Sequence, residues 1–318
     1  MSLLLTGATG FVGQHLVSAL IQRNLPYQIA VRTHAGNSAH PGCISVGDIN
    51  AHTAWSQALE GVTDVVHLAA RVHITQETST DAYAAFRAVN TEGTLNFARQ
   101  AAAAGVRRFV FLSSVKVNGE GSPHAYLENN TPAPEDAYAV SKWEAEQGLW
   151  EISSDTGMQI VILRIPLVYG PGVGANFLQL LQTVNKGWPL PLGDIANRRS
   201  LLYIGNLVDA ILVGLEHSDA ANKLYLLSDG QDVSTTQLVE FIASALKKSP
   251  RLFSLPQGML RLVAGIMGKS SAVDRLFGSL FLDSSKFRQE LSWVPPFSPQ
   301  QGLAETVQWF LNAQANRS

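Results

Sequence analysis

The chain is poor in charge and in cysteine. Charged residues make up 15% of its 318 positions and hydrophobic residues 46%, a composition typical of a globular protein and not of a disordered one. The formal net charge of −2 gives no electrostatic footprint for nucleic acid or for an anionic membrane surface, so a bound anion would need a few placed arginines. The single cysteine, Cys43, excludes an intramolecular disulfide, and we expect it to be inertly packed.

Long hydrophobic runs are also lacking. The first run is the three residues Leu3–Leu5, much shorter than the apolar core of a secretory signal peptide. The stretch Met259–Met267 is interrupted by Arg261 and falls far short of a membrane-spanning helix, which needs about 20 residues. It predicts a core helix or an interfacial patch. Internal repeats of solenoid length are absent from the sequence, and we expect a cytoplasmic protein without a transmembrane segment.

Short apolar runs alternate with longer amphipathic ones through the first half of the chain. The apolar runs predict strands buried on both faces, and they lie at Leu3–Leu5, Gln28–Val31, Ile44–Val46, Val65–Leu68, Phe109–Leu112 and Ile160–Leu163. The amphipathic runs predict helices at Val12–Gln22, Thr53–Leu59, Asp81–Ala104 and Ala137–Ser154, with Gly105 and Gly157 as stops after the last two. Repetition of this kind predicts an α/β fold with a doubly wound parallel sheet.

The sequence pattern changes after about Pro171, where prolines and glycines become frequent and the alternation is lost. We therefore expect a nucleotide-binding Rossmann domain over residues 1–170 and a smaller, mainly helical substrate lobe over residues 171–318, with the chain crossing back at least once. Helices of this lobe are predicted at Ala175–Lys186, Gly205–Glu216, Thr235–Lys247, Leu255–Gly268 and Ser298–Ala313. A cleft between the two parts is the default ligand site.

A glycine-rich turn follows the first predicted strand and opens the first helix. Its sequence, residues 6–13, is TGATGFVG. One glycine allows the tight bend, one lets the backbone approach a pyrophosphate, and the last lets helix and strand pack closely. The helix N-terminus then offers unpaired N–H groups to the phosphates. The turn predicts a dinucleotide site whose contacts are Gly7, Thr9, Gly10, Phe11, Val12 and Gly13.

The choice between NAD and NADP depends on the end of the second strand. An acidic residue there would bind the adenosine ribose hydroxyls and favour NAD, but the sequence has Arg32 and no acid. An arginine can clamp a 2′-phosphate or stack on adenine, and a solvated surface residue is the less favoured alternative. We expect NADP to be slightly favoured over NAD, with use of both left open.

A tyrosine and a lysine stand four residues apart in the fourth predicted helix. Tyr138 and Lys142 therefore share one helix face. A free phenol has a pKa of about 10, and a nearby ammonium would favour the phenolate and bring that pKa toward neutrality. Ser113 and Ser114 end the fifth strand on the ligand side of the sheet, where a hydroxyl could polarise a substrate oxygen beside the tyrosine. The set predicts oxidation or reduction of a carbonyl or alcohol.

These motifs together resemble the extended short-chain dehydrogenase/reductase family, also called the NAD-dependent epimerase/dehydratase family. The likeness extends over Asp64–Ala70 (DVVHLAA), Asn90–Thr94 (NTEGT) and Leu163–Gly172 (LRIPLVYGPG). It implies a catalytic set of Ser114, Tyr138 and Lys142, with the serine five residues before Gly119. The cofactor contacts that it implies are Asp48, Ile49, Leu68, Ala69, Ala70, Asn90, Pro166 and Val168, with Tyr138 and Lys142 also touching the cofactor and no metal ligand.

The resemblance also indicates a sugar-nucleotide substrate. Asn176 resembles the family's asparagine after VYGPG, and Arg199 its arginine before the next helix, which would bind a diphosphate bidentately. Ser113 and Lys116 are further candidate substrate contacts beside Ser114. A homodimer stays open.

Departures from the family pattern narrow the subgroup. Dehydratases carry Asp-Glu after the catalytic hydroxyl, whereas this chain has Val115 and Lys116, so 4,6-dehydration is not expected. Lys116 and Asn118 also depart from the usual UDP-galactose 4-epimerase pattern. The segments SSVKVNGEG and SKWEAEQGL resemble bacterial UDP-4-keto-6-deoxy-N-acetylhexosamine 4-reductases of the quinovosamine type, which serve surface polysaccharide synthesis. We therefore expect a 4-reductase. A UDP-hexose or UDP-N-acetylhexosamine 4-epimerase, a reductase of small carbonyls and a non-catalytic NADP-sensing regulator are the alternatives.

Overall fold

The computed structural model describes residues 2–33, 42–72, 81–256, 258–259 and 276–315. Its main feature is a seven-stranded sheet, in which every neighbouring pair of strands is parallel. The strand order is β3-β2-β1-β4-β5-β6-β9. The strands are β1 Leu3–Thr6, β2 Tyr27–Val31, β3 Cys43–Ser45, β4 Asp64–His67, β5 Arg108–Ser114, β6 Gln159–Ile165 and β9 Lys223–Leu226. The predicted doubly wound α/β fold is confirmed.

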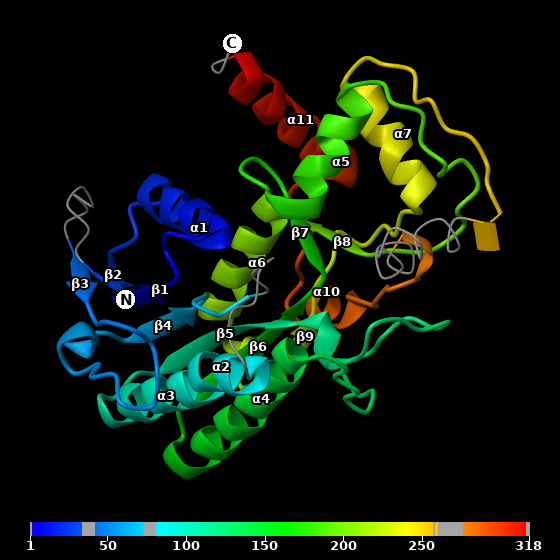
Figure 1. Ribbon diagram of the computed structural model, residues 1–318. Helices are drawn as coiled ribbons and strands as arrows, with labels where there is room; N and C mark the ends of the chain where they lie inside the picture. Colours follow the sequence, from blue (N-terminus) through cyan, green and yellow to red (C-terminus); the bar gives the residue numbers. More distant parts are fainter. Residues whose placement is uncertain (1, 34–41, 73–80, 257, 260–275, 316–318) are drawn as a thin grey trace.

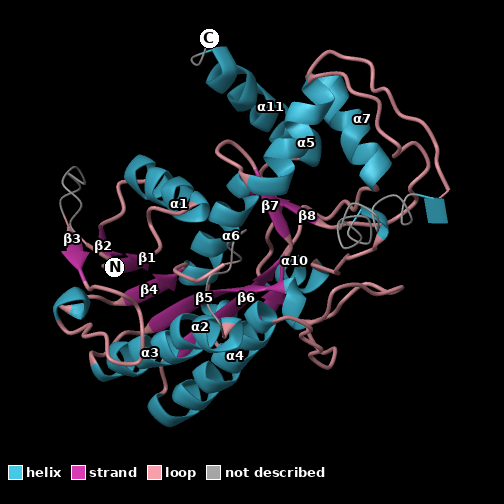
Figure 2. Ribbon diagram, viewed as in Figure 1, coloured by secondary structure: helices cyan, strands magenta, loops and turns pink. Residues whose placement is uncertain are grey.

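Helices cover both faces of this sheet (Figure 2). One face carries α1 (Phe11–Gln22) and α6 (Ile204–Glu216), which contact each other. The opposite face carries α2 (Ala82–Arg87), α3 (Thr94–Ala103) and α4 (Ala137–Thr156). Alternate strand residues enter the two cores: Val110 and Val161 pack on the α1 and α6 side, whereas Phe109 and Ile160 pack on the α3 and α4 side. Burial on both faces explains why the strands have continuous apolar sequences.

The residues beyond Pro171 form a second layer of structure and also return to the main sheet. A two-stranded parallel sheet pairs β7 (Leu167–Tyr169) with β8 (Leu201–Tyr203). Helix α11 (Pro299–Ala315) packs on it, α7 (Thr235–Ala245) packs on α11 and on α5 (Ala175–Asn185), and α10 (Ser285–Glu290) packs on β9. Figure 1 shows α5, α7 and α11 together at one end of the molecule. Between these elements the chain supplies α6 and β9 to the main sheet.

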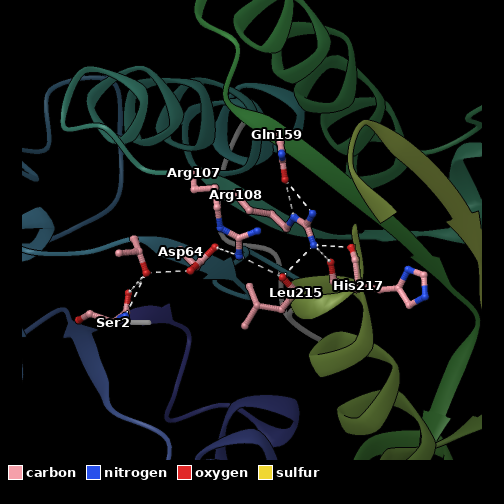
Figure 3. Close-up of polar contacts among 9 residues, drawn as sticks. Ser2, Asp64, Arg107, Arg108, Gln159, Leu215 and His217 are labelled. Atoms are coloured by element: carbon pink, nitrogen blue, oxygen red, sulfur yellow. Dashed lines mark hydrogen bonds and ion pairs between the residues drawn. The ribbon is translucent and has the colours of Figure 1, made fainter. Parts of the chain in front are cut away.

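Two arginines at the amino end of β5 fasten α6 to the sheet (Figure 3). Arg108 is buried, and its Nη1 donates to the carbonyl oxygens of Gly214, Leu215 and His217. These carbonyls lie at the helix C-terminus, where a cation is favourable. Arg107 forms an ion pair of 2.5 Å with Asp64 at the start of β4. The network lies at the amino ends of the strands, so it leaves the carboxyl ends of the strands available for a ligand site.

Some predicted elements differ from the structure. The helix expected at Thr53–Leu59 is reduced to a 3₁₀ turn at Gln57–Leu59, because Thr53 Oγ1 donates to the carbonyl of Asp48 and also accepts from the N–H of Asn50. The strands β7, β8 and β9 were not predicted. The helix expected at Leu255–Gly268 falls mostly outside the described residues. Within the part of the chain that the structure describes, no helix is long and apolar enough to cross a membrane.

Candidate active site

The glycine turn between β1 and α1 is shaped by close backbone contacts. Gly7 has φ +73°, and a Cβ there would lie 2.7 Å from the N atom of Ala69. A Cβ on Gly13 would lie 2.1 Å from the carbonyl oxygen of Gly7. Gly10 is the N-cap residue of α1 and provides no side-chain cap, so the first-turn N–H groups remain available to phosphate oxygens. These residues fit the pyrophosphate of a dinucleotide.

The other parts of the turn agree with this arrangement. Thr9 is exposed, and Phe11 and Val12 are half-buried at the start of α1. The loop after β4 is held against the turn, because the N–H of Ala69 donates to Thr6 Oγ1 at 3.2 Å. The β1–β4 neighbourhood is also where the strand order reverses, the usual ligand crevice of open α/β sheets. The predicted contacts Leu68, Ala69 and Ala70 lie in this loop.

Arg32, expected to choose the cofactor, pairs with Asp48. Its Nε lies 2.9 Å from Asp48 Oδ1, and both side chains are more than three-quarters exposed. An exposed pair of this kind is worth little to stability, so Arg32 keeps the freedom to turn toward a phosphate. Ile49, the next predicted contact, packs against Gly93, where a Cβ would lie 2.7 Å from the Ile49 Cγ2 atom.

Asn90 fixes the backbone between the cofactor loop and the catalytic helix. It is fully buried in a π-helical turn, Ala88–Gly93, between α2 and α3. Its Oδ1 accepts from the N–H of Arg71, while its Nδ2 donates to the carbonyl of Arg71 and to Ser141 Oγ. Because Ser141 precedes Lys142, Asn90 positions the lysine through α4.

Tyr138 and Lys142 lie on α4, whose N-cap Asp136 accepts from the N–H of Ala139. Lys142 is buried and its Nζ donates to the carbonyl oxygen of Leu112 at 2.9 Å. Burial lowers the pKa of Lys142 to about 7, opposed by the Glu146 carboxylate. Burial, and secondly Asp136, raises the pKa of Tyr138 to about 12. The phenol is therefore protonated at neutral pH, which is the form that donates a proton.

This pKa corrects one sequence-based expectation. The spacing of Tyr138 and Lys142 predicts that the ammonium lowers the phenol pKa, whereas in this structure burial and Asp136 raise it. The physical reason is that the ammonium donates to a backbone carbonyl of β5 and that desolvation disfavours the phenolate. Lys142 instead affects His67, which is neutral because burial, and secondly Lys142, lowers its pKa to about 3.

A buried ion pair contacts Ser113, the residue before Ser114, and was not predicted. Glu146, one helical turn after Lys142, and Arg164 on β6 are both buried and form a bidentate pair with a shortest contact of 2.6 Å. Ser113 Oγ donates to Glu146 Oε1 at 2.5 Å, and Arg164 Nη1 donates to Asn118 Oδ1 at 3.0 Å. The sequence signal was an arginine inside a strand buried on both faces, which requires a buried acid as partner.

The network changes the interpretation of three residues. Ser113, expected as a substrate contact, is buried and its hydroxyl is bound to Glu146. Asn118 also binds within the protein, since its Nδ2 donates to the carbonyl of Leu127. Lys116 Nζ donates to Glu120 and Asp136 at 2.6 and 2.7 Å. All three side chains are thus bonded to protein groups in this structure, and the substrate contacts expected of Ser113 and Lys116 stay predictions.

The remaining predicted contacts are dispersed. Ser114 is nearly buried, and its Oγ accepts from the N–H of Lys116. Pro166 follows β6 and is buried, and Val168 is half-buried in β7. Asn176 is exposed in the first turn of α5, and Arg199 Nη1 donates to the carbonyl of Gly278. These last two belong to the substrate lobe and not to the catalytic helix or its strand, so their part in binding stays a prediction.

Comparison with known proteins gives the family. The profile of the NAD dependent epimerase/dehydratase family matches residues 3–227. The chain belongs to this family. Over 318 aligned residues it is 46% identical to a UDP-glucose 4-epimerase from Vibrio cholerae, with 98% of this chain and 96% of that protein covered. The family prediction is thus confirmed. The expected subgroup was a 4-reductase, whereas this relative is a 4-epimerase.

Two further relatives agree at the level of the family. An N-acetyl-alpha-D-glucosaminyl-diphospho-ditrans,octacis-undecaprenol 4-epimerase from Escherichia coli O157:H7 is 31% identical, with 98% of this chain and 96% of that protein covered. The crystal structure of a UDP-glucose 4-epimerase from Thermus thermophilus, a complex with NAD, superposes with a TM-score of 0.77 at 25% identity, covering 98% of this chain and 100% of that one. The chain is therefore an enzyme of an NAD-dependent family.

Proposed function

We propose that this enzyme is a nucleotide-sugar 4-epimerase, acting on a UDP-hexose or UDP-N-acetylhexosamine with NAD(P) held in the glycine turn. The observation that carries the proposal is the 46% identity to a UDP-glucose 4-epimerase along 98% of the chain, together with the half-buried Tyr138 and the buried Lys142 on α4. The 4-reductase expected from the sequence is the second candidate.

The structure weakens the sequence argument against an epimerase. That argument rested on Lys116 and Asn118, which depart from the usual epimerase pattern. Here Lys116 pairs with Glu120 and Asp136, and Asn118 bonds Arg164 and a backbone carbonyl. Because both side chains hold protein groups, their identity carries little information about the sugar. A dehydratase remains disfavoured, because Val115 and Lys116 occupy the positions at which dehydratases carry their Asp-Glu acid–base pair.

In the proposed reaction, Tyr138 handles the proton and Ser114 provides an oriented hydroxyl at the sugar C4. NAD(P), when bound, accepts and returns the C4 hydride. Tyr138, as the phenolate, would accept the proton of the C4 hydroxyl when the hydride leaves, and as the phenol it would return that proton to the ketone oxygen; its raised pKa favours the phenol of the return step. Ser114 would hydrogen-bond the same oxygen, and Lys142 would hold the cofactor ribose. Asn176 and Arg199 would hold the sugar nucleotide. In an epimerase the keto sugar must also rotate in the site, so that the hydride returns to the opposite face of C4.

Product analysis tests the epimerase proposal. The purified protein is incubated with UDP-glucose, and separately with UDP-N-acetylglucosamine, without added cofactor and with NAD. We expect the corresponding C4 epimer to accumulate to equilibrium with at least one substrate, measured by proton NMR. Absence of an epimer from both substrates in all conditions would contradict the proposal. Consumption of NADPH with a UDP-4-keto-6-deoxy sugar would then favour the 4-reductase.

Arg32 provides a prediction about the cofactor. Replacing it (Arg32→Ala) should weaken NADP(H) binding about tenfold, because a charge-assisted contact to a 2′-phosphate is lost. NAD(H) binding should change by less than about twofold, since the pair with Asp48 is exposed and contributes little. Calorimetric titration of both cofactors measures this, with the exposed Arg99→Ala on α3 as control. Equal losses for the two cofactors would show that Arg32 does not contact a 2′-phosphate.

A further inference from the structure

Four large apolar side chains are exposed on neighbouring segments of the substrate lobe. They are Trp188 (60% exposed), Met259 (55%), Phe253 (44%) and Leu276 (36%), here called the apolar patch. The segments 186–194 and 247–259 run side by side, because the N–H of Leu190 donates to the carbonyl of Arg251 and the N–H of Phe253 donates back to Leu190. These bonds bring the segment of Trp188 beside that of Phe253, and exposed apolar side chains on paired segments indicate an interaction surface.

A cavity of about 560 Å³ ties Leu276 to the same surface. It is lined by residues from three segments, namely 194–197, 254–256 and 277–279. The last of these directly follows Leu276, and the first two continue from the segments that carry Trp188 and Phe253. In Figure 1 the two long segments pass α5 and α7 at the end of the molecule far from α2, α3 and α4. The patch is therefore separate from the catalytic helix.

Basic residues lie on the same two segments as Trp188 and Phe253. Lys186, Lys247, Lys248 and Arg251 are all exposed, and Lys186 Nζ lies 5.0 Å from the ring centroid of Trp188. Asp194 is the sole acid in the described residues of segments 186–194 and 247–259. In the sequence, residues 241–259 contain three Lys or Arg and no Asp or Glu. The small net charge of the whole chain thus conceals a local basic surface.

We propose that this surface docks on an anionic lipid bilayer, with Trp188 and Phe253 entering the headgroup region and the basic residues facing lipid phosphates. Tryptophan favours the boundary between headgroups and acyl chains, and lysine and arginine beside apolar residues strengthen binding to anionic lipid. A second copy of the chain fits less well, because a symmetric contact would bring the basic residues of both copies together. The proposal is independent of the reaction proposed above.

Vesicle sedimentation tests this directly. The full chain is mixed with large unilamellar vesicles of phosphatidylcholine, with or without about 30% phosphatidylglycerol. We expect partition into the anionic vesicles at least about tenfold stronger than into neutral ones, and weaker binding at about 0.5 M salt because charges are screened. Failure to bind the anionic vesicles at low salt would overturn the proposal.

Two variants and two controls separate its parts. The double variant Trp188→Ser/Phe253→Ser should lower partition at least about tenfold, and Lys247→Gln/Arg251→Gln should lower it about tenfold at low salt only. Ile21→Ser on α1 and Arg99→Gln on α3 remove an exposed apolar group and an exposed charge elsewhere, and should leave partition unchanged. An equal loss in these controls contradicts the assignment. So does a fall in molar mass by light scattering on Trp188→Ser/Phe253→Ser, which would identify a contact between copies.

Discussion

Replacing Tyr138 by phenylalanine is expected to lower turnover by about 10³-fold or more, while the cofactor still binds. The substitution removes one hydroxyl and keeps the ring, which packs edge-on to Phe86 at a centroid distance of 6.0 Å. The loss is large because the hydroxyl is the group that takes and returns the C4 proton, and water replaces a positioned acid–base group poorly. Steady-state kinetics and cofactor titration measure the two effects separately.

A matched tyrosine provides the control for this prediction. Tyr27 stands at the amino end of β2, at the edge of the sheet opposite the site. Tyr27→Phe should therefore change turnover by less than about twofold. If Tyr138→Phe retains most of the activity, or if it abolishes cofactor binding, the assigned role of the phenol is wrong.

The buried pair of Glu146 and Arg164 predicts the largest change in stability. Glu146→Gln leaves a guanidinium buried beneath the active site without its carboxylate, which should lower the free energy of unfolding by about 3 kcal/mol or more. Glu146→Leu/Arg164→Met removes both charges and should recover much of that loss, because the desolvation cost of each ion also disappears. Urea unfolding followed by circular dichroism measures the two variants.

An exposed ion pair is the control for this comparison. Lys223 Nζ lies 3.4 Å from Glu290, and both side chains are partly solvated, so Lys223→Gln should cost less than about 1 kcal/mol. A similarly small effect of Glu146→Gln would mean that water or another protein group compensates the charge of Arg164. The buried pair would then not be needed to hold Ser113.

The main sheet was predictable because its strands are buried on both faces. Continuous apolar runs such as Phe109–Leu112 can pack only between two layers of helices, and the glycine stops Gly105 and Gly157 adopt the left-handed conformation expected of them. The strands β7 and β8 have three residues each and lie where prolines and glycines interrupt the strand–helix alternation of the sequence. The strand β9 begins with a lysine and lies at the sheet edge.

The site was predictable to the extent that it depends on local spacing. Tyr138 and Lys142 share a helix face, and the glycine turn joins a strand to a helix, so one stretch of sequence defines each feature. The pair of Glu146 and Arg164 joins residues 18 positions apart that lie on different elements, and the contact of Lys116 with Asp136 spans 20 positions. Their geometry, and the burial that raises the pKa of Tyr138, follow from tertiary packing.

The fate of the hydrogen at the sugar C4 tests the central claim most directly. UDP-glucose labelled with deuterium at C4 is incubated with the protein without added cofactor, and the product is analysed by mass spectrometry and NMR. If the enzyme is a 4-epimerase, the C4 epimer forms with its deuterium retained, because the same hydride leaves and returns. Loss of the label to solvent, or turnover that occurs only with stoichiometric consumption of NADPH and a 4-keto substrate, would contradict it.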